Sequence, residues 1–480
     1  MRCIIFNELI KLLWYNAIAF GCAGCKEPQI PADRLLSEIW EGFVLISAEI
    51  KTKAEKIAEK DGISFFRISS EKFKTSRVDL FFLDKLEKNR ASGNAIIPSV
   101  LKRGCRTYQT QRDLEMRLEE LYGADADGGC NKKGEMQIIN FYMSHISDKF
   151  TSGNDKLFDD CSDLLMCILK NPVTENNGFK GSVFKQERDN LVDYIRSRIN
   201  DKMRFSFLRC MEEMCSGEPF AISEEGSEED ALLLTPVKTY ALYQDLLASY
   251  PAYVYISGSV DDSDVHRLID RFGEIDRRNV GRLEFPDVMR NVGKVKYVDE
   301  SMNVSQGKLC LGFRTNVAPT SKDYYPLVVY NGILGGDVHS KLFQNVREKA
   351  SLAYYSQSVL EKYKGLMVIM SGIEADNRAK AEKIILEQFE DMKKGVISKN
   401  EIDATKKSLK TGLKTMQDSQ GAIVDFFLSQ HMTGNGEDFE SVAEKLDAVT
   451  VDEVVKVARK IQLDTVYFLK PDGDRSEKED

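Results

Sequence analysis

Histidine is scarce in this chain of 480 residues. Its four copies, His145, His266, His339 and His431, lie far apart, and none has another histidine or a cysteine at the spacing of metal ligands. Zinc sites usually take pairs of ligands a few positions apart in the sequence. Each histidine is therefore predicted to be an isolated surface or core residue. No glycine-rich phosphate loop or nucleophile motif is present either, and we predict no cofactor.

Cysteine occurs ten times but follows no regular framework. Several copies, such as Cys161, Cys167 and Cys210, lie inside apolar patterns, which is typical of buried thiols in a reducing compartment. The only C-x-x-C pair is Cys22 with Cys25, and it has no second pair and no nearby histidine. We interpret these two thiols as structural or incidental rather than as zinc ligands.

The chain also has no excess of positive charge and no long hydrophobic run. Its net charge is −9, which argues against nucleic acid as a partner because phosphate binding requires a basic surface. The longest uncharged run near the N-terminus, Leu12–Cys25, is too short to span a bilayer. We expect no membrane partner and a cytoplasmic protein. The alternative is export or lipid anchoring through a poor signal that ends near Cys22 or Cys25.

Apolar periodicity predicts alternating blocks of strands and helices. Two capping boxes, Ser398-x-x-Glu401 and Thr450-x-x-Glu453, mark helix starts. The predicted strands are Gly62–Ser70, Arg77–Asp84, Ala124–Cys130, Glu135–Ser144, Ala252–Val260, Gln306–Thr315, Ala353–Leu360, Leu366–Ile373 and Val466–Lys470. The predicted helices are Ile50–Lys60, Ala91–Arg103, Thr110–Leu121, Asp155–Leu169, Ser182–Met214, Pro236–Ser249, Asp262–Phe272, Ser321–Leu334, Ser340–Glu348, Ala379–Lys394, a helix from Ser398, Ala422–Met432, Asp438–Leu446 and Val454–Ile461.

The two halves of the chain share one order of elements. Leu118–Phe141 runs like Val346–Met370: a charged helix end, a strand, a Lys-Gly turn and a second strand. A period of half the chain indicates two homologous domains, and the mixture of elements predicts an α+β fold. The predicted organisation is an N-terminal extension (1–60), a first domain (61–275), a linker (276–296), a second domain (297–471) and a disordered tail (472–480).

One stretch of the second half, LGGDVHSKLFQNVREKASLAY, carries a family pattern. It resembles the M16 (insulinase, pitrilysin, mitochondrial processing peptidase) metallopeptidases, which read roughly LGGG-x-SSRLF-x-x-(L/V)RE-x-x-x-LAY, with Asp337 here in place of the third glycine. The resemblance implies two LuxS/MPP-like metallohydrolase-type domains. It also implies that Arg347 and Tyr354 hold substrate. Judged from the residues alone, Arg347 is a solvated helix-end cation and Tyr354 a core residue, and this alternative stays open.

The zinc motif of the family, His-x-x-Glu-His, is missing from the first half. Alignment on Gly104–Cys105 places Ala95 and Ser99 at the histidine positions and Pro98 at the glutamate, and no slip of register restores the motif because no histidine precedes His145. Further along, ERDNLVDY resembles the family's ER-x-x-V-x-x-E, with Tyr194 where the ligand glutamate belongs. The first glutamate is kept as Glu187, which the residues alone predict to be a surface carboxylate.

The resemblance therefore implies a catalytically incomplete M16 homologue, closest to a YfmF-like bacterial branch. The first hypothesis is a non-zinc subunit that pairs with a zinc-bearing homologue, or with itself, and grips a peptide in an inter-domain chamber through Arg347 and Tyr354. The alternative is a purely structural or peptide-binding protein. A third hypothesis is a stand-alone enzyme with a different site.

Overall fold

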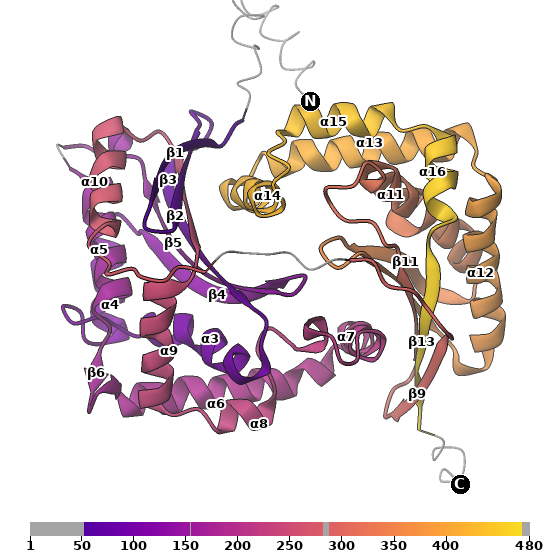
Figure 1. Cartoon of the computed structure of the whole chain (residues 1–480), viewed down its shortest axis with the longest axis horizontal. Coiled ribbons are helices and arrows are strands. Elements are labelled where there is room, and N and C mark those ends of the chain that lie inside the picture. The colour runs from indigo at the N-terminus through magenta and orange to yellow at the C-terminus, as the bar shows by residue number, and fades with distance from the viewer. Residues whose placement is uncertain (1–51, 154, 282–287, 473–480) are drawn as a thin grey trace, which may run out of the picture. The chain divides into compact units, whose positions relative to one another are not determined.

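The computed structural model describes residues 52–153, 155–281 and 288–472 (Figure 1). The predictions for the first 51 residues and for the tail from residue 473 lie outside the described residues. The first half contains β1 (Glu55–Lys60), β2 (Ile63–Ser69), β3 (Thr75–Lys85), α3 (Lys88–Leu101), α4 (Gln111–Glu120), β4 (Asp125–Lys133), β5 (Met136–Ile146), η1 (Asp148–Phe150), α5 (Leu157–Lys170), β6 (Thr174–Glu175), β7 (Gly178–Phe179), α6 (Gly181–Ser197), η2 (Arg198–Asn200), α7 (Lys202–Met214), η3 (Pro219–Ala221), α8 (Glu228–Leu232), α9 (Pro236–Ser249), β8 (Ala252–Gly258) and α10 (Asp262–Phe272).

The second half begins with a strand and has the same mixture of elements. It contains β9 (Lys296–Met302), β10 (Gly307–Arg314), α11 (Tyr324–Asn331), η4 (Gly332–Gly336), η5 (Phe343–Lys349), β11 (Ala353–Glu361), β12 (Leu366–Ile373), η6 (Ala375–Asn377), α12 (Arg378–Lys394), α13 (Lys399–Met416), α14 (Gln420–Thr433), α15 (Phe439–Ala448), α16 (Val451–Ala458) and β13 (Gln462–Pro471). The described residues between α10 and β9 form no helix or strand.

The two main sheets are ordered β1-β2-β8-β3-β5-β4 and β11-β12-β10-β13-β9. Each contains one parallel pair, β2 with β8 and β9 with β13. The other pairs are antiparallel, including the hairpins β4–β5 and β11–β12. The fold is thus mixed α and β, as predicted, and all strands but the short pair β6–β7 lie in the two main sheets.

The first sheet buries both of its faces. Successive side chains of a strand point to opposite faces: Phe65 packs with the helices of the first half, while its neighbour Phe66 packs in the core of the second half. Helices α5 and α10 cover the first of these faces (Figure 1). The adjacent apolar residues within β2 (Phe65 and Phe66) and β3 (Leu80–Leu83) are typical of burial on both sides.

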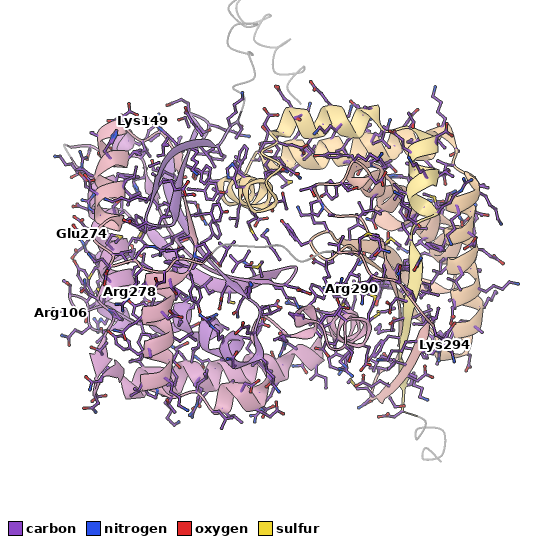
Figure 2. All side chains as sticks on the ribbon, viewed as in Figure 1. Arg106, Lys149, Glu274, Arg278, Arg290 and Lys294 are labelled. Atoms are coloured by element: carbon purple, nitrogen blue, oxygen red, sulfur yellow. The ribbon has the colours of Figure 1, made fainter. Side chains whose placement is uncertain are left out.

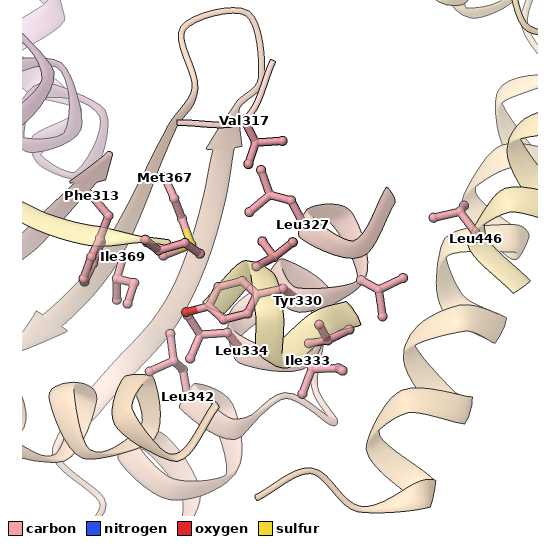
Figure 3. Close-up of a cluster of buried hydrophobic side chains, with 14 of the residues drawn as sticks. Phe313, Val317, Leu327, Tyr330, Ile333, Leu334, Leu342, Met367, Ile369 and Leu446 are labelled. Carbon is pink, nitrogen blue, oxygen red and sulfur yellow. The ribbon is translucent and has the colours of Figure 1, made fainter. Parts of the chain in front are cut away.

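The second sheet has a large core on one face. Phe313, Met367 and Ile369 of its strands face the α11 and η4 region, including Tyr330 and Leu334 (Figure 3). On the other face lies a smaller cluster that includes Cys310, Val368 and Tyr467 together with residues of α7.

One helix of each half packs on the sheet of the other half. Helix α7 packs on β10 and β13, and helix α14 packs on β8. Met214 of α7 contacts the second sheet so closely that a Cβ at Gly312 would lie 2.7 Å from its sulfur. From α14, His431 stacks on Phe66 with ring centroids 4.0 Å apart. The two halves are therefore joined by reciprocal packing.

The predicted single helix Ser182–Met214 is wrong, because it is two helices. Helix α6 ends at Ser197, η2 follows, and α7 restarts where the Asp201 side chain accepts a hydrogen bond from the Arg204 N–H at 3.0 Å. Aspartate is a favoured N-cap. The break lets α6 pack in the first half while α7 reaches the second sheet.

The predicted helix Ile50–Lys60 is also wrong. The structure describes this segment from residue 52 on, and there Glu55–Lys60 forms strand β1. The charged sequence suits a helix, but the following Asp61 and Gly62 have φ of 51° and 75°. Two consecutive positive φ values form the type I′ turn, and Asp-Gly is a strong hairpin signal. The turn therefore folds this segment back on β2 as an edge strand.

The contact of His431 with the first sheet should make stability depend on pH. Its Nδ1 lies 2.8 Å from the Tyr255 hydroxyl, and burial, with a smaller contribution from Lys56, lowers the pKa of His431 to about 4. The unfolded chain therefore binds the proton first as the pH falls, so stability is lost between about pH 6.5 and pH 4. Allowing for the partial exposure of the ring, we expect a loss of roughly 1–2 kcal/mol.

Denaturant unfolding at several pH values, with His431→Phe beside the wild type, measures this effect. Stability of the variant should fall less between pH 6.5 and pH 4, whatever its absolute stability. His266→Gln is the matched control, since His266 is exposed on α10, and it should keep the wild-type slope. Equal slopes in wild type and His431→Phe would contradict the assignment.

Candidate functional site

The helix that corresponds to the zinc helix of the resemblance is α3. Ala95 and Ser99 lie one turn apart and are half-buried, while Pro98 is buried inside the helix. Residues at i and i+4 share one helix face, so the two histidine positions face the same way. A methyl group, a proline ring and a hydroxyl group cannot supply the two imidazole ligands of zinc or the carboxylate that acts as general base on its water. The residues present do not fit this metal.

Helix α6 packs against α3 and carries the two remaining positions. Tyr194 is exposed, with 44% of its surface accessible. The prediction of a surface carboxylate at Glu187 is wrong: this residue is buried and accepts a hydrogen bond from Arg103 Nε at 2.5 Å and one from Asn190 Nδ2 at 3.3 Å. A buried carboxylate needs such partners. Arg103 lies two residues after the last residue of α3. The ion pair between Glu187 and Arg103 therefore holds α6 against the end of α3.

The four histidines lie on separate segments of the fold, and His339 is in the turn between η4 and η5. His145 is buried on β5 and pairs with its neighbour's carbonyl, His266 is exposed on α10, His339 contacts Thr405, and His431 is in the inter-half contact. Among the described residues, no three His, Cys, Asp or Glu side chains are grouped so that they could hold a metal ion.

Arg347 and Tyr354 flank the turn between η5 and β11. Val346 and Leu342 of the same helical segment are fully buried, which fixes the helix against the core. Arg347 lies in the last turn, half exposed, with its guanidinium 4.5 Å from the Phe343 ring centroid and 3.6 Å from Glu348. This agrees with a helix-end cation, whose charge is favoured by the helix dipole.

Tyr354 is not a core residue. It is 78% exposed, the highest exposed fraction among the large hydrophobic side chains of the described chain. Ala353 pairs with Ile373 and Tyr355 with Gly372, so Tyr354 is the extra residue of a β-bulge. Bulges re-aim side chains and are frequent beside active sites. The phenol group is therefore free to contact a ligand.

The turn before this bulge is strained. Ser351 has φ of 51°, a left-handed conformation that is uncommon for residues other than glycine and that persists where the surrounding structure imposes it. The Ser351 hydroxyl donates to the Glu348 carbonyl at 3.3 Å, and the Leu352 N–H donates to Val346 O at 3.1 Å. Sequence reasoning missed both the strain and the bulge, since serine is not a typical residue for this conformation.

The glycine turn positions this region against the sheet. A Cβ at Gly335 would lie 2.5 Å from the Ser358 backbone nitrogen of β11, so only glycine allows η4 to approach so closely. Asp337, which stands in place of the third glycine, has φ of −157°. This is extended backbone open to any residue, so the replacement costs no backbone strain. Its carboxylate accepts a hydrogen bond from Ser408 at 2.6 Å.

Comparison with known proteins agrees with this architecture. The family described as Peptidase M16 inactive domain matches residues 235–409. The "Probable inactive metalloprotease YmfF" of Bacillus subtilis is 35% identical over 409 residues, covering 85% of this chain and 96% of that protein. The "Uncharacterized zinc protease YmxG" of the same organism is 25% identical over 217 residues, covering 43% and 50%.

Solved structures show the same fold. A conserved protein from Enterococcus faecalis superposes with a TM-score of 0.82 at 27% identity, covering 88% of this chain and 99% of that one. A protease from Helicobacter pylori gives a TM-score of 0.73 at 16% identity, covering 88% and 100%, and supports the fold alone. The chain belongs to the M16 peptidase family, as an inactive member similar to YmfF. In the described part, no helix has the length and apolar character to cross a membrane.

Proposed function

We propose that this chain is the non-zinc subunit of a heteromeric M16 peptidase and that it contributes substrate binding through Arg347 and Tyr354. The observation that supports this most is the bulge, which holds Tyr354 at 78% exposure next to a strained turn and a half-exposed arginine. Exposed aromatic and cationic groups held by a rigid backbone suit binding better than packing. The zinc-activated water would come from the partner chain, because α3 has no ligands for it.

The partner is an M16 homologue with an intact His-x-x-Glu-His motif. We expect the chain alone to leave peptides uncut, and to co-purify with such a homologue from the same genome when the two are expressed together. The mixture should hydrolyse peptides faster than either chain alone. The matched control is the homologue with its motif glutamate replaced by glutamine, which should still co-purify but give no hydrolysis. Absence of a complex and of any gain in hydrolysis would contradict the proposal.

A second function, purely structural or peptide-binding, is favoured by one observation. Arg347 already has partners on its own segment, Phe343 and Glu348, so its cation is satisfied without a substrate. In that case the complex would form, but its activity would not depend on either residue. Substitution of the Arg347 and Tyr354 pair, described in the Discussion, separates the two functions.

A further inference from the structure

Two cysteines of the first half lie in contact although they are 62 positions apart. The Sγ atoms of Cys105 and Cys167 are 2.7 Å from each other, and both residues are free thiols. Sulfur atoms in a disulfide are about 2.05 Å apart. Formation of a bond therefore needs a movement of less than about 1 Å, within the reach of small side-chain rotations.

The backbone on both sides holds this contact in place. Cys105 forms an isolated antiparallel bridge with Pro172, and the Arg106 N–H donates to Asn171 O at 2.7 Å. Cys167 lies on α5, whose last residue is Lys170. The loop after α3 and the end of α5 are thus joined by main-chain contacts, so the two thiols cannot easily separate.

The two thiols differ in access to solvent. Cys105 is fully buried, and burial, with the neighbouring Cys167, raises its pKa to about 11. Cys167 is partly exposed and donates to the Thr107 hydroxyl at 3.5 Å. Arg106, next to Cys105, reaches the surface (Figure 2). The pair therefore lies just below the surface, with Cys167 as the accessible member and Cys105 as the protected one.

We propose that Cys105 and Cys167 form a reversible disulfide under oxidising conditions. This disulfide cross-links the loop after α3 to the end of α5. The oxidant is a low-molecular-weight disulfide. The Cys167 thiolate attacks one sulfur of this disulfide, forms a mixed disulfide and releases one thiolate. The Cys105 thiolate then attacks the Cys167 sulfur and releases the second thiolate. The small disulfide is reduced to two thiols, which take up the two protons that the cysteines lose.

The disulfide would act on α3, the helix that carries the positions of the family's zinc motif. Arg103 lies two residues before Cys105 and pairs with the buried Glu187 of α6. Oxidation would therefore restrain the ends of α3 and α5 together with the part of α6 around Glu187. A cross-link over 62 positions also restricts the unfolded chain, which stabilises the folded state.

The test uses the purified full-length chain, equilibrated in mixtures of reduced and oxidised glutathione and then trapped by acid and alkylation. Non-reducing peptide mapping by mass spectrometry should find Cys105 linked to Cys167. The melting temperature of the oxidised chain should exceed that of the reduced chain by several degrees. Cys167→Ser and Cys105→Ser should each abolish the shift, whereas Cys130→Ala, at a partly exposed thiol outside the pair, should preserve it.

Two results would overturn the proposal. One is a peptide map that shows only glutathione adducts or links between other cysteines. The other is a rise in melting temperature on oxidation that persists in Cys167→Ser. This variant tests the pair even if Cys105→Ser, which changes a buried site, does not fold. Neither result depends on peptidase activity, so the disulfide is tested independently of the proposed function.

Discussion

Replacing Arg347 by alanine and Tyr354 by phenylalanine together is expected to lower kcat/KM of the assembled peptidase complex by about 10²–10³, the usual cost of removing a preorganised donor from a transition state. The change removes one cation and one hydroxyl group and leaves the core untouched, since Tyr354 is 78% exposed and Arg347 is half exposed. Exposed substitutions change stability by about 0.5 kcal/mol or less. Loss of activity would therefore not reflect unfolding.

The controls use equivalent chemistry at other exposed positions of the second half. Tyr297→Phe changes a tyrosine that is 61% exposed on β9, at the opposite edge of the same sheet. Lys349→Ala removes an exposed cation in the same last helical turn as Arg347. Both should keep full activity. Initial rates over a range of peptide concentrations separate KM from kcat, and full activity of the double variant would favour the structural function.

Lys364→Met is expected to destabilise the chain by about 3–5 kcal/mol, because it removes a buried cation and leaves the partly buried carboxylate of Glu135 without it. Lys364 is 1% exposed in the turn between β11 and β12. Its Nζ contacts Glu135, in the turn between β4 and β5, and Glu218 Oε2 at 2.7 Å. Glu218 also accepts a hydrogen bond from Arg314 at 2.6 Å. Burial alone would raise the pKa of Glu218, but the hydrogen bonds from Arg314 and Lys364 outweigh it and lower the pKa.

The same turns are closely packed, so the variant cannot relax easily. A Cβ at Gly134 would lie 2.8 Å from the Tyr363 Cβ. Denaturant unfolding of the wild type and Lys364→Met gives the difference in free energy. Lys410→Met, which breaks a half-exposed pair with Asp447, should cost less than about 1 kcal/mol. Adding Glu135→Gln to Lys364→Met should recover part of the loss, and a loss below 1 kcal/mol in the single variant would contradict the buried network.

Local sequence signals predicted much of the secondary structure. The capping boxes at Ser398 and Thr450 are formed, each with the side chain of its N3 glutamate bonded back to the cap. Helix α10 has the predicted bounds Asp262–Phe272. Such signals act within one helical turn, so they do not depend on the rest of the fold. The family pattern likewise pointed to Arg347 and Tyr354, whose role in substrate binding stays a prediction, and to the positions at which the zinc motif is replaced.

The tertiary structure alone decided which of those residues are exposed and which are buried. Glu187 is an ordinary carboxylate in the sequence, and its burial is compensated mainly by Arg103, which lies 84 positions away. The exposure of Tyr354 depends on the register of β11 against β12, and the break between α6 and α7 places α7 on a sheet of the other half. Burial and register arise from contacts between distant segments, whereas capping and periodicity arise from neighbours along the chain.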